Sequence, residues 1–430
     1  MGRNTGLVLL SVFLLACGRS DRTADHQFSI THEDGVEVRV TTGGPKHQED
    51  LFRYEMVCEL RFDEEVEESL LIRPWSFTMD EEGKFYVADS GNHRIAVFDA
   101  DGTYQRSIGQ RGRGPGDLFG PIEVEIVAGM LRVAGAPGDQ TTFFTLDGRF
   151  VESLRFDRAT MSLRQMYRID PDCVLAVLSL RDSDSESMRF GMRVLVLNSD
   201  QDTLATVDAA PIDMAVMRNA KTAVYIMSTG TLEVRERAIP SYLHYTGLAQ
   251  AAYLPARQEI LVTNGQEPIL DFYGLDGRLR SRIRVDVHQE RVTQEEKDEL
   301  TAIFDQDLED ARAREGPRAQ MAVIQAQSAR EILIVPDMKA WWAGFVVDDE
   351  GYIWLLRPRI QDGRATNRTR SVRVLSPKGE YLGDSTWPAS YMGGNILRGH
   401  LLVIRLDPET DEWIPTVYRM IPAVDGFRYP

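Results

Sequence analysis

The chain has 430 residues, of which 43% are hydrophobic and 27% are charged, and it contains three cysteines. Its 66 acidic residues outnumber its 49 basic residues and give a formal net charge of −17 at pH 7. Because the phosphates of nucleic acids attract basic proteins, this acidic chain is expected to have no nucleic-acid partner.

The N-terminus has the pattern of an export signal. Arg3 precedes an apolar run from Leu7 to Ala16, which is too short to form a membrane-spanning helix. The run ends in Leu-Leu-Ala-Cys at Cys17 and resembles the lipobox of bacterial lipoproteins, with a less usual leucine at its middle position. The resemblance implies a signal peptide at 1–16 and acylation of Cys17 after cleavage. An ordinary signal peptide with a chance cysteine is the alternative.

Residues 17–35 are expected to consist of the acylated Cys17 and a flexible polar tether after it. Since Gly18 rather than Asp follows Cys17, nothing marks the protein for retention at the inner membrane. The resemblance therefore implies a lipid-anchored protein of the bacterial cell envelope, in the outer membrane and facing the periplasm or the cell surface. The membrane would be contacted through the lipid anchor only, because no later apolar run is long enough to span it.

Two further cysteines, Cys58 and Cys173, lie in apolar, strand-like runs. An oxidising compartment allows a disulfide between them. Their apolar surroundings favour two buried free thiols instead.

Short apolar runs separated by Gly, Asp and Pro dominate the rest of the chain and predict an all-β fold. One pattern, an apolar strand, a tight turn and a second apolar strand, occurs six times, at 78–88, 124–135, 167–178, 252–263, 346–356 and 395–406. A second hairpin with an Asp-Gly-like turn follows the first five of these, at 94–104, 141–150, 193–204, 269–280 and 373–382. Such turns are strong hairpin signals because glycine adopts a positive φ at low cost.

Two successive hairpins make a four-stranded antiparallel sheet, which is the blade of a β-propeller. Six first hairpins predict a six-bladed β-propeller whose sixth blade lacks a complete second hairpin. Its third strand is expected at 413–421 and its fourth at 53–62, near the N-terminus, so that the ring closes without an open edge. A further strand at 36–42 can add to this closure. Residues 36–430 are therefore expected to form a single domain.

The stretch VADSGNHRIAVFDADGTYQRSIGQRGRGPGDLFGP (87–121) resembles NHL-repeat propellers, and the chain as a whole resembles the bacterial six-bladed β-propeller lipoproteins. The likeness is close over 75–155 and 341–385 and loose over 160–250. It supports the architecture but implies no activity, because that lipoprotein group has no general assigned reaction.

A glycine-rich loop, GQRGRGPGDLFGP (109–121), joins the first predicted blade to the second. It has no Lys-Ser/Thr after its glycines and leads into a strand, so it lacks the stacked N–H groups of a helix that hold a phosphate. Connectors between blades share one face with the loops between second and third strands, so this loop is expected beside residues 88–94. Asp89 and Asn92 either bind a ligand there or only bond turn backbone. The candidate ligand-binding residues at this mouth of the channel are Asp89, Asn92, His93, Arg111 and Arg113.

The connector between the fourth and fifth blades, at about 289–334, is long and helical in pattern. Thr293 and Glu296 form a capping-box pattern, and Pro317 suits the first turn of a second helix. Apolar residues recur at helical spacing after the cap, at Leu300, Ile303, Phe304, Leu308 and Ala311. The insertion is expected to cover the channel mouth as a lid, to offer a groove to a partner, or to pack on the propeller's own surface.

Trp341 and Trp342 follow the insertion and open the inner strand of the fifth blade. Because successive side chains of a strand alternate, one is expected in the core and the other can face the channel and stack on a sugar or an aromatic ligand. Packing of both in the core is the alternative. Arginines crowd the next loop and either favour an anionic ligand group or are solvated, namely Arg357, Arg359, Arg364, Arg368 and Arg370. We take Trp341, Trp342 and Arg357 as further candidate ligand-binding residues.

Catalytic motifs such as HExxH and GxSxG do not occur, and the seven histidines show no metal-ligand spacing. No catalytic residue, cofactor or metal site is therefore expected. The predicted function is that of an envelope-tethered, non-catalytic binding scaffold for a protein, peptide or saccharide ligand at the channel mouth. The alternative is a metal-dependent propeller hydrolase or lyase that holds Ca²⁺ or another divalent ion in the channel, and a purely structural envelope component is a third hypothesis.

Overall fold

The computed structural model places most of the chain in strands. It describes residues 25–135, 140–155, 162–182, 189–213, 223–228, 231–236, 250–315, 319–331, 335–358, 368–390, 394–407, 409–410 and 412–429. The expected signal peptide and Cys17 lie outside these residues. Among the described residues, the helices include no candidate for a membrane-spanning segment.

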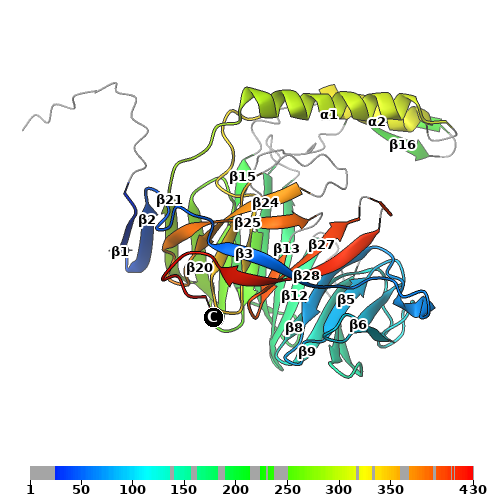
Figure 1. Ribbon diagram of the computed structural model, residues 1–430, viewed down its shortest axis with the longest axis horizontal. Coiled ribbons are helices and arrows are strands. Elements are labelled where there is room, and N and C mark those ends of the chain that lie inside the picture. Colours follow the sequence, from blue (N-terminus) through cyan, green and yellow to red (C-terminus); the bar gives the residue numbers. More distant parts are fainter. Residues whose placement is uncertain are drawn as a thin grey trace, which may run out of the picture.

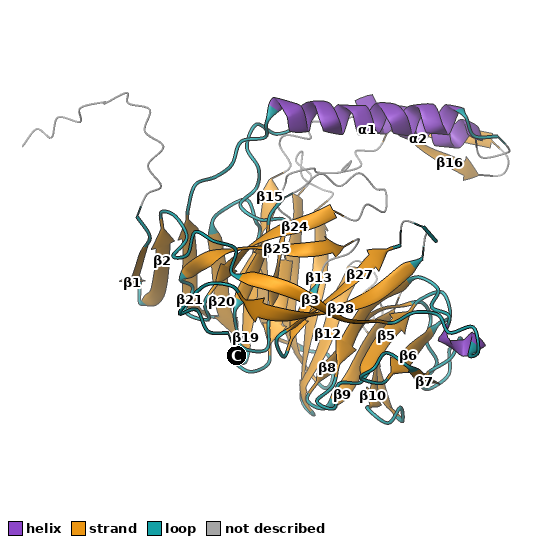
Figure 2. Cartoon of the chain, in the orientation of Figure 1, coloured by secondary structure: helices purple, strands orange, loops and turns teal. Residues whose placement is uncertain are grey.

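Six four-stranded antiparallel sheets form the blades of a propeller, as the sequence predicts (Figures 1 and 2). Each of the first three blades consists of two successive hairpins, with the first strand innermost. Blade 1 is β4 (Pro74–Met79), β5 (Phe85–Asp89), β6 (Arg94–Phe98) and β7 (Tyr104–Ile108). Blade 2 is β8 (Pro121–Val127), β9 (Met130–Gly135), β10 (Gln140–Thr145) and β11 (Phe150–Arg155). Blade 3 is β12 (Ser162–Asp170), β13 (Cys173–Asp182), β14 (Arg189–Asn198) and β15 (Thr203–Asp213).

The last three blades continue the same order around the ring. Blade 4 is β18 (Gln250–Leu254), β19 (Glu259–Thr263), β20 (Ile269–Gly274) and β21 (Leu279–Asp286). Blade 5 is β22 (Gly344–Val347), β23 (Ile353–Leu356), β24 (Arg368–Leu375) and β25 (Tyr381–Ser390). Blade 6 is β26 (Asn395–Leu397), β27 (His400–Leu406), β28 (Trp413–Pro422) and, from the N-terminal region, β3 (Phe52–Glu59).

The ring closes through strand β3, which pairs antiparallel with β28, for example Arg419 with Glu55. This confirms the closure predicted from the sequence. The strand expected at 36–42 exists as β2 (Val36–Thr42), but it does not join blade 6. It pairs parallel with β21 at the outer edge of blade 4, and β1 (Gln27–Glu33) pairs with it as a hairpin. The outer edge of β21 offers free backbone groups, and β2 satisfies them.

Residues 26–51 form a strap that runs along the outer edges of blades 4 and 5. After β2 the strap bonds to blade 5, where Lys46 N donates to Tyr381 O at 3.1 Å and Leu51 N donates to Asp384 O at 2.9 Å. Leu51 is fully buried in the core cluster between blades 5 and 6. The N-terminal strap therefore links blades 4 and 5 to the closing strand of blade 6.

The hydrophobic core lies between neighbouring blades. Each interface has its own apolar cluster, such as the one in which Tyr86 and Ile95 of blade 1 meet Leu131 and Val133 of blade 2. Burying a side chain of this size contributes about 1.5–3 kcal/mol. Cys58 and Cys173 are free thiols, as the sequence favours, and they are partly rather than fully buried.

Helices α1 (Gln294–Arg312) and α2 (Ala319–Glu331) connect β21 to β22 and lie over one face of the propeller (Figure 1). We call this the rim face. The predicted capping box is present, since Glu296 N donates to Thr293 Oγ1 and Thr293 N donates to Glu296 Oε2. Lys339 Nζ, in the segment that leads from the insertion back to blade 5, lies 2.7 Å from Glu296 Oε1. A hairpin that the sequence did not indicate, β16 (Ala223–Ser228) and β17 (Thr231–Glu236), falls between blades 3 and 4. A short 3₁₀ helix, η1 (Glu67–Ser69), precedes blade 1.

Candidate functional site

The centre of the propeller contains a cavity of about 300 Å³. Its walls come from all six blades, chiefly from their innermost strands. We call this the channel cavity. Its lining includes Trp75 of blade 1, Glu123 and Glu125 of blade 2, Gln165 and Tyr167 of blade 3, Tyr253 of blade 4, Phe345 of blade 5 and Asn395 of blade 6.

Blade 2 brings charge to this cavity. Glu123 and Glu125 lie two residues apart on β8 and therefore share one face of the strand. Arg132, on β9, pairs in register with Glu125 and is fully buried. Its Nη2 lies 2.8 Å from Glu123 Oε1 and 2.8 Å from Glu125 Oε2, and its Nε lies 3.1 Å from Glu125 Oε2. One guanidinium thus holds two carboxylates at the cavity wall.

Blade 3 completes this cluster. Gln165 Nε2 donates to Glu123 Oε1 at 2.8 Å, and the Arg132 guanidinium carbon lies 4.4 Å from the centre of the Tyr167 ring. A guanidinium over an aromatic face gains electrostatic stabilisation from the ring. Arg132 Nη1 is nevertheless buried without a hydrogen-bond partner among the described residues.

Burial raises the pKa of the Glu125 carboxyl, and the neighbouring Glu123 raises this pKa further against the opposing pull of Arg132. Glu125 therefore keeps its proton to a higher pH than an ordinary glutamate does. Its side chain still exposes 37% of its surface, and since Glu125 lines the cavity, a molecule in the channel can reach it.

Across the ring from blade 2 stands blade 5, which contributes Phe345, Val346 and Val347 to the cavity. Trp75 of blade 1 is 37% exposed and lies edge-on to Trp413, with ring centres 6.2 Å apart. The channel cavity is therefore acidic on one wall and apolar on the opposite one.

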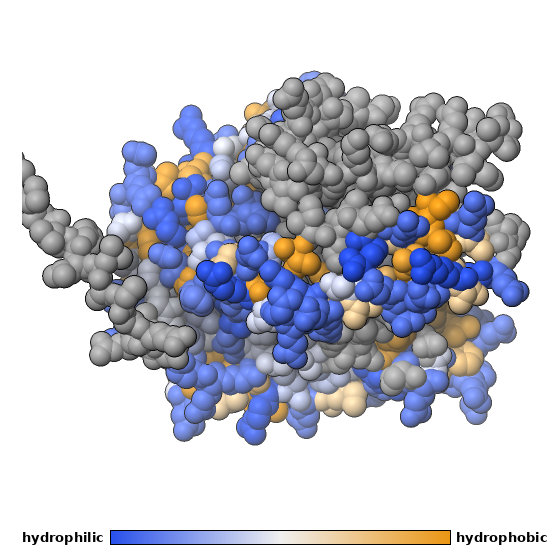
Figure 3. All heavy atoms as spheres, turned by 90° about the horizontal axis from the view of Figure 1, so that it is seen from above, coloured by the Kyte–Doolittle hydropathy of each residue, from blue (hydrophilic) through white to orange (hydrophobic). Residues whose placement is uncertain are grey.

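The rim face seen from above is largely hydrophilic among its coloured atoms, and hydrophobic residues show only as separate patches (Figure 3).

The predicted site residues of blade 1 hold the chain together at the turn after β5. Asp89 is fully buried and accepts hydrogen bonds from Ile72 N at 2.8 Å, Asn92 Nδ2 at 2.7 Å and Arg94 Nε at 2.9 Å. Asn92 also donates to Leu70 O at 2.9 Å. Both side chains thus fix residues 70–72 against the turn, and their ligand role stays a prediction.

The glycine-rich loop lies beside this turn, where the sequence analysis expects it. His93 Nδ1 accepts a hydrogen bond from Gly120 N at 2.9 Å, and its ring centre lies 5.2 Å from that of Phe119. Within the loop, Leu118 N donates to Gln110 O at 2.7 Å and connects the two ends of the crossing. The two arginines of the loop, Arg111 and Arg113, are exposed, and neither forms an ion pair with a described residue.

The candidates of blade 5 form a separate group. Trp342 is buried between blades 4 and 5, and its Nε1 donates to Thr263 Oγ1 at 3.0 Å. Trp341 is half-buried against the same core cluster. Arg357 lies 3.2 Å from Glu290 and 2.9 Å from Asp384, so it ties blade 5 to the base of the helical insertion. Arg359 and Arg364 lie outside the described residues.

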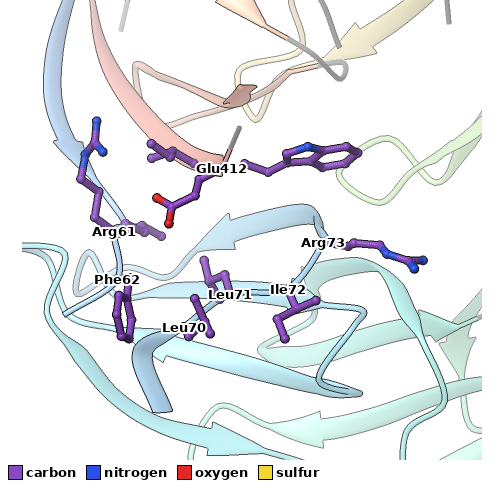
Figure 4. Close-up of a pocket in the computed structure, with 10 residues that line it drawn as sticks. Arg61, Phe62, Leu70, Leu71, Ile72, Arg73 and Glu412 are labelled. Atoms are coloured by element: carbon purple, nitrogen blue, oxygen red, sulfur yellow. The ribbon is translucent and has the colours of Figure 1, made fainter. Parts of the chain in front are cut away.

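A second pocket, of about 260 Å³, lies at the seam between blades 6 and 1 (Figure 4). Leu70, Leu71 and Ile72 form one wall, and Trp413 and Ile414 line it from blade 6. In Figure 4 the Arg73 side chain points away from these apolar residues. Since the Asp89 turn fixes residues 70–72, the polar residues of the turn shape this seam pocket.

None of the eight predicted site residues lines the channel cavity. Conversely, Glu123, Glu125 and Arg132 are not among the residues predicted from the sequence. A signal for them exists, because two acids at alternate positions of an apolar strand, Ile-Glu-Val-Glu-Ile (122–126), are followed across a tight turn by an arginine in Leu-Arg-Val. In the hairpin around Ala128-Gly129 the register places Glu125 opposite Arg132.

The described residues include no group of three or more His, Cys, Asp or Glu side chains that could hold a metal ion.

Comparison with known proteins finds the NHL repeat at residues 71–98, which covers β4, β5 and β6 of blade 1. No curated protein sequence matches the chain.

Several solved structures resemble the propeller at low identity. A protein of Bacteroides fragilis described as exported is 11% identical, with a TM-score of 0.47, and the match covers 89% of this chain and 99% of that one. A member of the DUF4221 family from Bacteroides vulgatus is 11% identical with a TM-score of 0.47, covering 87% and 100%. A streptogramin B lyase is 11% identical with a TM-score of 0.35, covering 86% and 87%. At these scores the likeness assigns no activity or ligand to this chain.

Proposed function

We propose that this protein is an envelope-tethered, non-catalytic binding protein that holds a small ligand, or the end of a larger one, in the channel cavity. The tether rests on the lipobox-like sequence at Cys17. The place of binding rests on the cavity at the centre of the ring.

The observation that carries the proposal is the cluster of Arg132, Glu123 and Glu125. Charged groups are expensive to bury, and an ion pair replaced by apolar residues of similar size often leaves a protein as stable or more stable. A buried donor without a partner, such as Arg132 Nη1, costs a further 1–3 kcal/mol or so. The cluster is therefore not explained by the stability of the propeller, and such costs are typical of binding sites.

The size and lining of the cavity support a small ligand. A volume of about 300 Å³ is at the lower end of small-molecule sites. An apolar wall with a few fixed polar groups is also typical of such sites. A protein, peptide or saccharide partner would accordingly insert one residue or one sugar unit into the channel.

A channel-blocking variant tests this proposal. Ala252 lines the cavity on β18, and Ala252→Trp would fill it. A thermal-shift screen of the wild-type protein with amines, amino acids, monosaccharides and carboxylates should find compounds that raise the melting temperature, and Ala252→Trp should lose that response. If no compound stabilises the wild type, or if the hits stabilise Ala252→Trp equally, the proposal is wrong.

A further inference from the structure

We propose that the ligand of the channel cavity is an organic cation, an amine or a guanidine with an apolar body. This inference rests on the proposed function and adds the chemical class of the ligand. Three features of the cavity carry it: its net charge, the acceptor atoms that the cluster leaves open, and the apolar wall on the far side.

The charge of the cavity is negative. Among the residues that line it, the charged ones are Glu123 and Glu125. Arg132 stands behind them and does not itself line the cavity. With both glutamates ionised, the three side chains carry a net charge of −1. In a partly enclosed cavity, such a charge acts on a ligand more strongly than the same charge on an open surface does.

Each carboxylate keeps one oxygen for a ligand. Glu123 Oε1 accepts from Arg132 and Gln165, and Glu125 Oε2 accepts from Arg132 twice. The other oxygen of each carboxylate, Glu123 Oε2 or Glu125 Oε1, accepts no hydrogen bond from a described residue. Neither oxygen is among the buried side-chain atoms that lack a partner, so both are accessible. These two acceptors are available to an N–H donor, and the fully buried Arg132, whose Nη1 has no partner, holds both carboxylates in place.

The opposite side of the ring suits the rest of the ligand. Phe345, Val346 and Val347 line the cavity from blade 5, opposite the glutamates, and the half-exposed ring of Trp75 borders it from blade 1, next to blade 2. An apolar body can pack on these side chains while the charged nitrogen bonds the glutamates. Aromatic faces also attract cations. An anion would meet two carboxylates first, and a neutral ligand would gain no charge-assisted hydrogen bond.

The experiment uses calorimetric titration of the full chain with three probes of similar shape. Phenethylamine is a cation, phenethyl alcohol is neutral, and phenylacetate is an anion. The wild type should bind phenethylamine at least tenfold more tightly than either of the other probes. Glu125→Gln should weaken phenethylamine binding on the order of tenfold, because a charge-assisted hydrogen bond is lost. Glu49→Gln, which changes an exposed glutamate outside the channel, should bind as the wild type does.

The outcomes separate the ligand class from the site. If phenethyl alcohol or phenylacetate binds as tightly as the amine and Ala252→Trp abolishes that binding, the cation class is wrong and the channel site stands. If no probe binds, the cation class is wrong, and the thermal-shift screen decides whether the channel site stands. If Ala252→Trp binds the amine normally, both proposals fail. Should Glu125→Gln not fold, Glu123→Gln and the salt dependence of the wild type replace it, since added salt should weaken the binding of a cation.

Discussion

The fully buried Asp89 gives a sharp test of how the turn after β5 works. Its carboxylate accepts three hydrogen bonds, from Ile72 N at 2.8 Å, Asn92 Nδ2 at 2.7 Å and Arg94 Nε at 2.9 Å. Asp89→Ala leaves the Arg94 guanidinium, only 12% exposed, without its carboxylate. Removing one partner of a buried ion pair costs about 3–5 kcal/mol. At roughly 2 °C per kcal/mol for a large domain, the melting temperature should fall by about 6–10 °C.

The assay is thermal unfolding followed by circular dichroism, with Asp101→Ala as the control, since Asp101 is exposed in a neighbouring turn. The control should melt within about 1 °C of the wild type, because exposed substitutions have small effects. The folded fraction of Asp89→Ala should still bind a channel ligand, because Asp89 does not line the cavity. If Asp89→Ala melts like the wild type and loses ligand binding, Asp89 is a binding residue and the structural reasoning is refuted.

Four further predictions follow from the fold and the channel cavity. Leu51→Ala should lower the free energy of unfolding by about 2–5 kcal/mol in a urea titration, because it creates a cavity where the N-terminal strap meets the core between blades 5 and 6. A smaller loss would show that the propeller does not need the strap for its stability. Burial raises the pKa of Glu125, so the wild type should lose stability relative to Glu125→Gln as the pH rises through that raised pKa; a difference in melting temperature that stays constant from pH 4 to 8, or that moves in favour of the wild type, would contradict the sign of the shift. For the same reason, amine binding should be full above the raised pKa of Glu125 and should weaken as the pH falls through it, which happens at a higher pH than for an ordinary glutamate. The charged or titratable neighbours of Glu125 are Glu123, Arg132 and Tyr167. Calorimetric titration across pH 4–8 measures this dependence. EDTA should leave the melting temperature unchanged, whereas a drop would favour the metal-dependent hydrolase or lyase.

Much of the propeller could be predicted from local signals. Gly102 has a φ of +84° in the Asp-Gly turn between β6 and β7, a conformation that favours glycine and marks the hairpin in the sequence. The cap at Thr293 is equally local, because both of its hydrogen bonds join residues three apart. The number of such hairpins predicts the number of blades and the need for a closing strand.

The position of β2 and the channel cluster could not be predicted in the same way, because both depend on contacts between distant segments. The pattern of β2 shows a strand but not which free edge it joins, and here the edge belongs to β21. The alternation along β8 places Glu123 and Glu125 on one face but does not say which face borders the channel. Gly91 shows a similar limit, since a Cβ there would lie 2.3 Å from Ile72 Cγ2, a contact that no local pattern reveals.

The most direct measurement is a crystal structure of the full chain soaked with phenethylamine. Our account predicts density for the probe in the channel cavity, with its nitrogen within hydrogen-bonding distance of Glu123 or Glu125 and its ring against Phe345 or Trp75. Density for the probe elsewhere on the protein, with only solvent in the channel at saturating concentration, would contradict it.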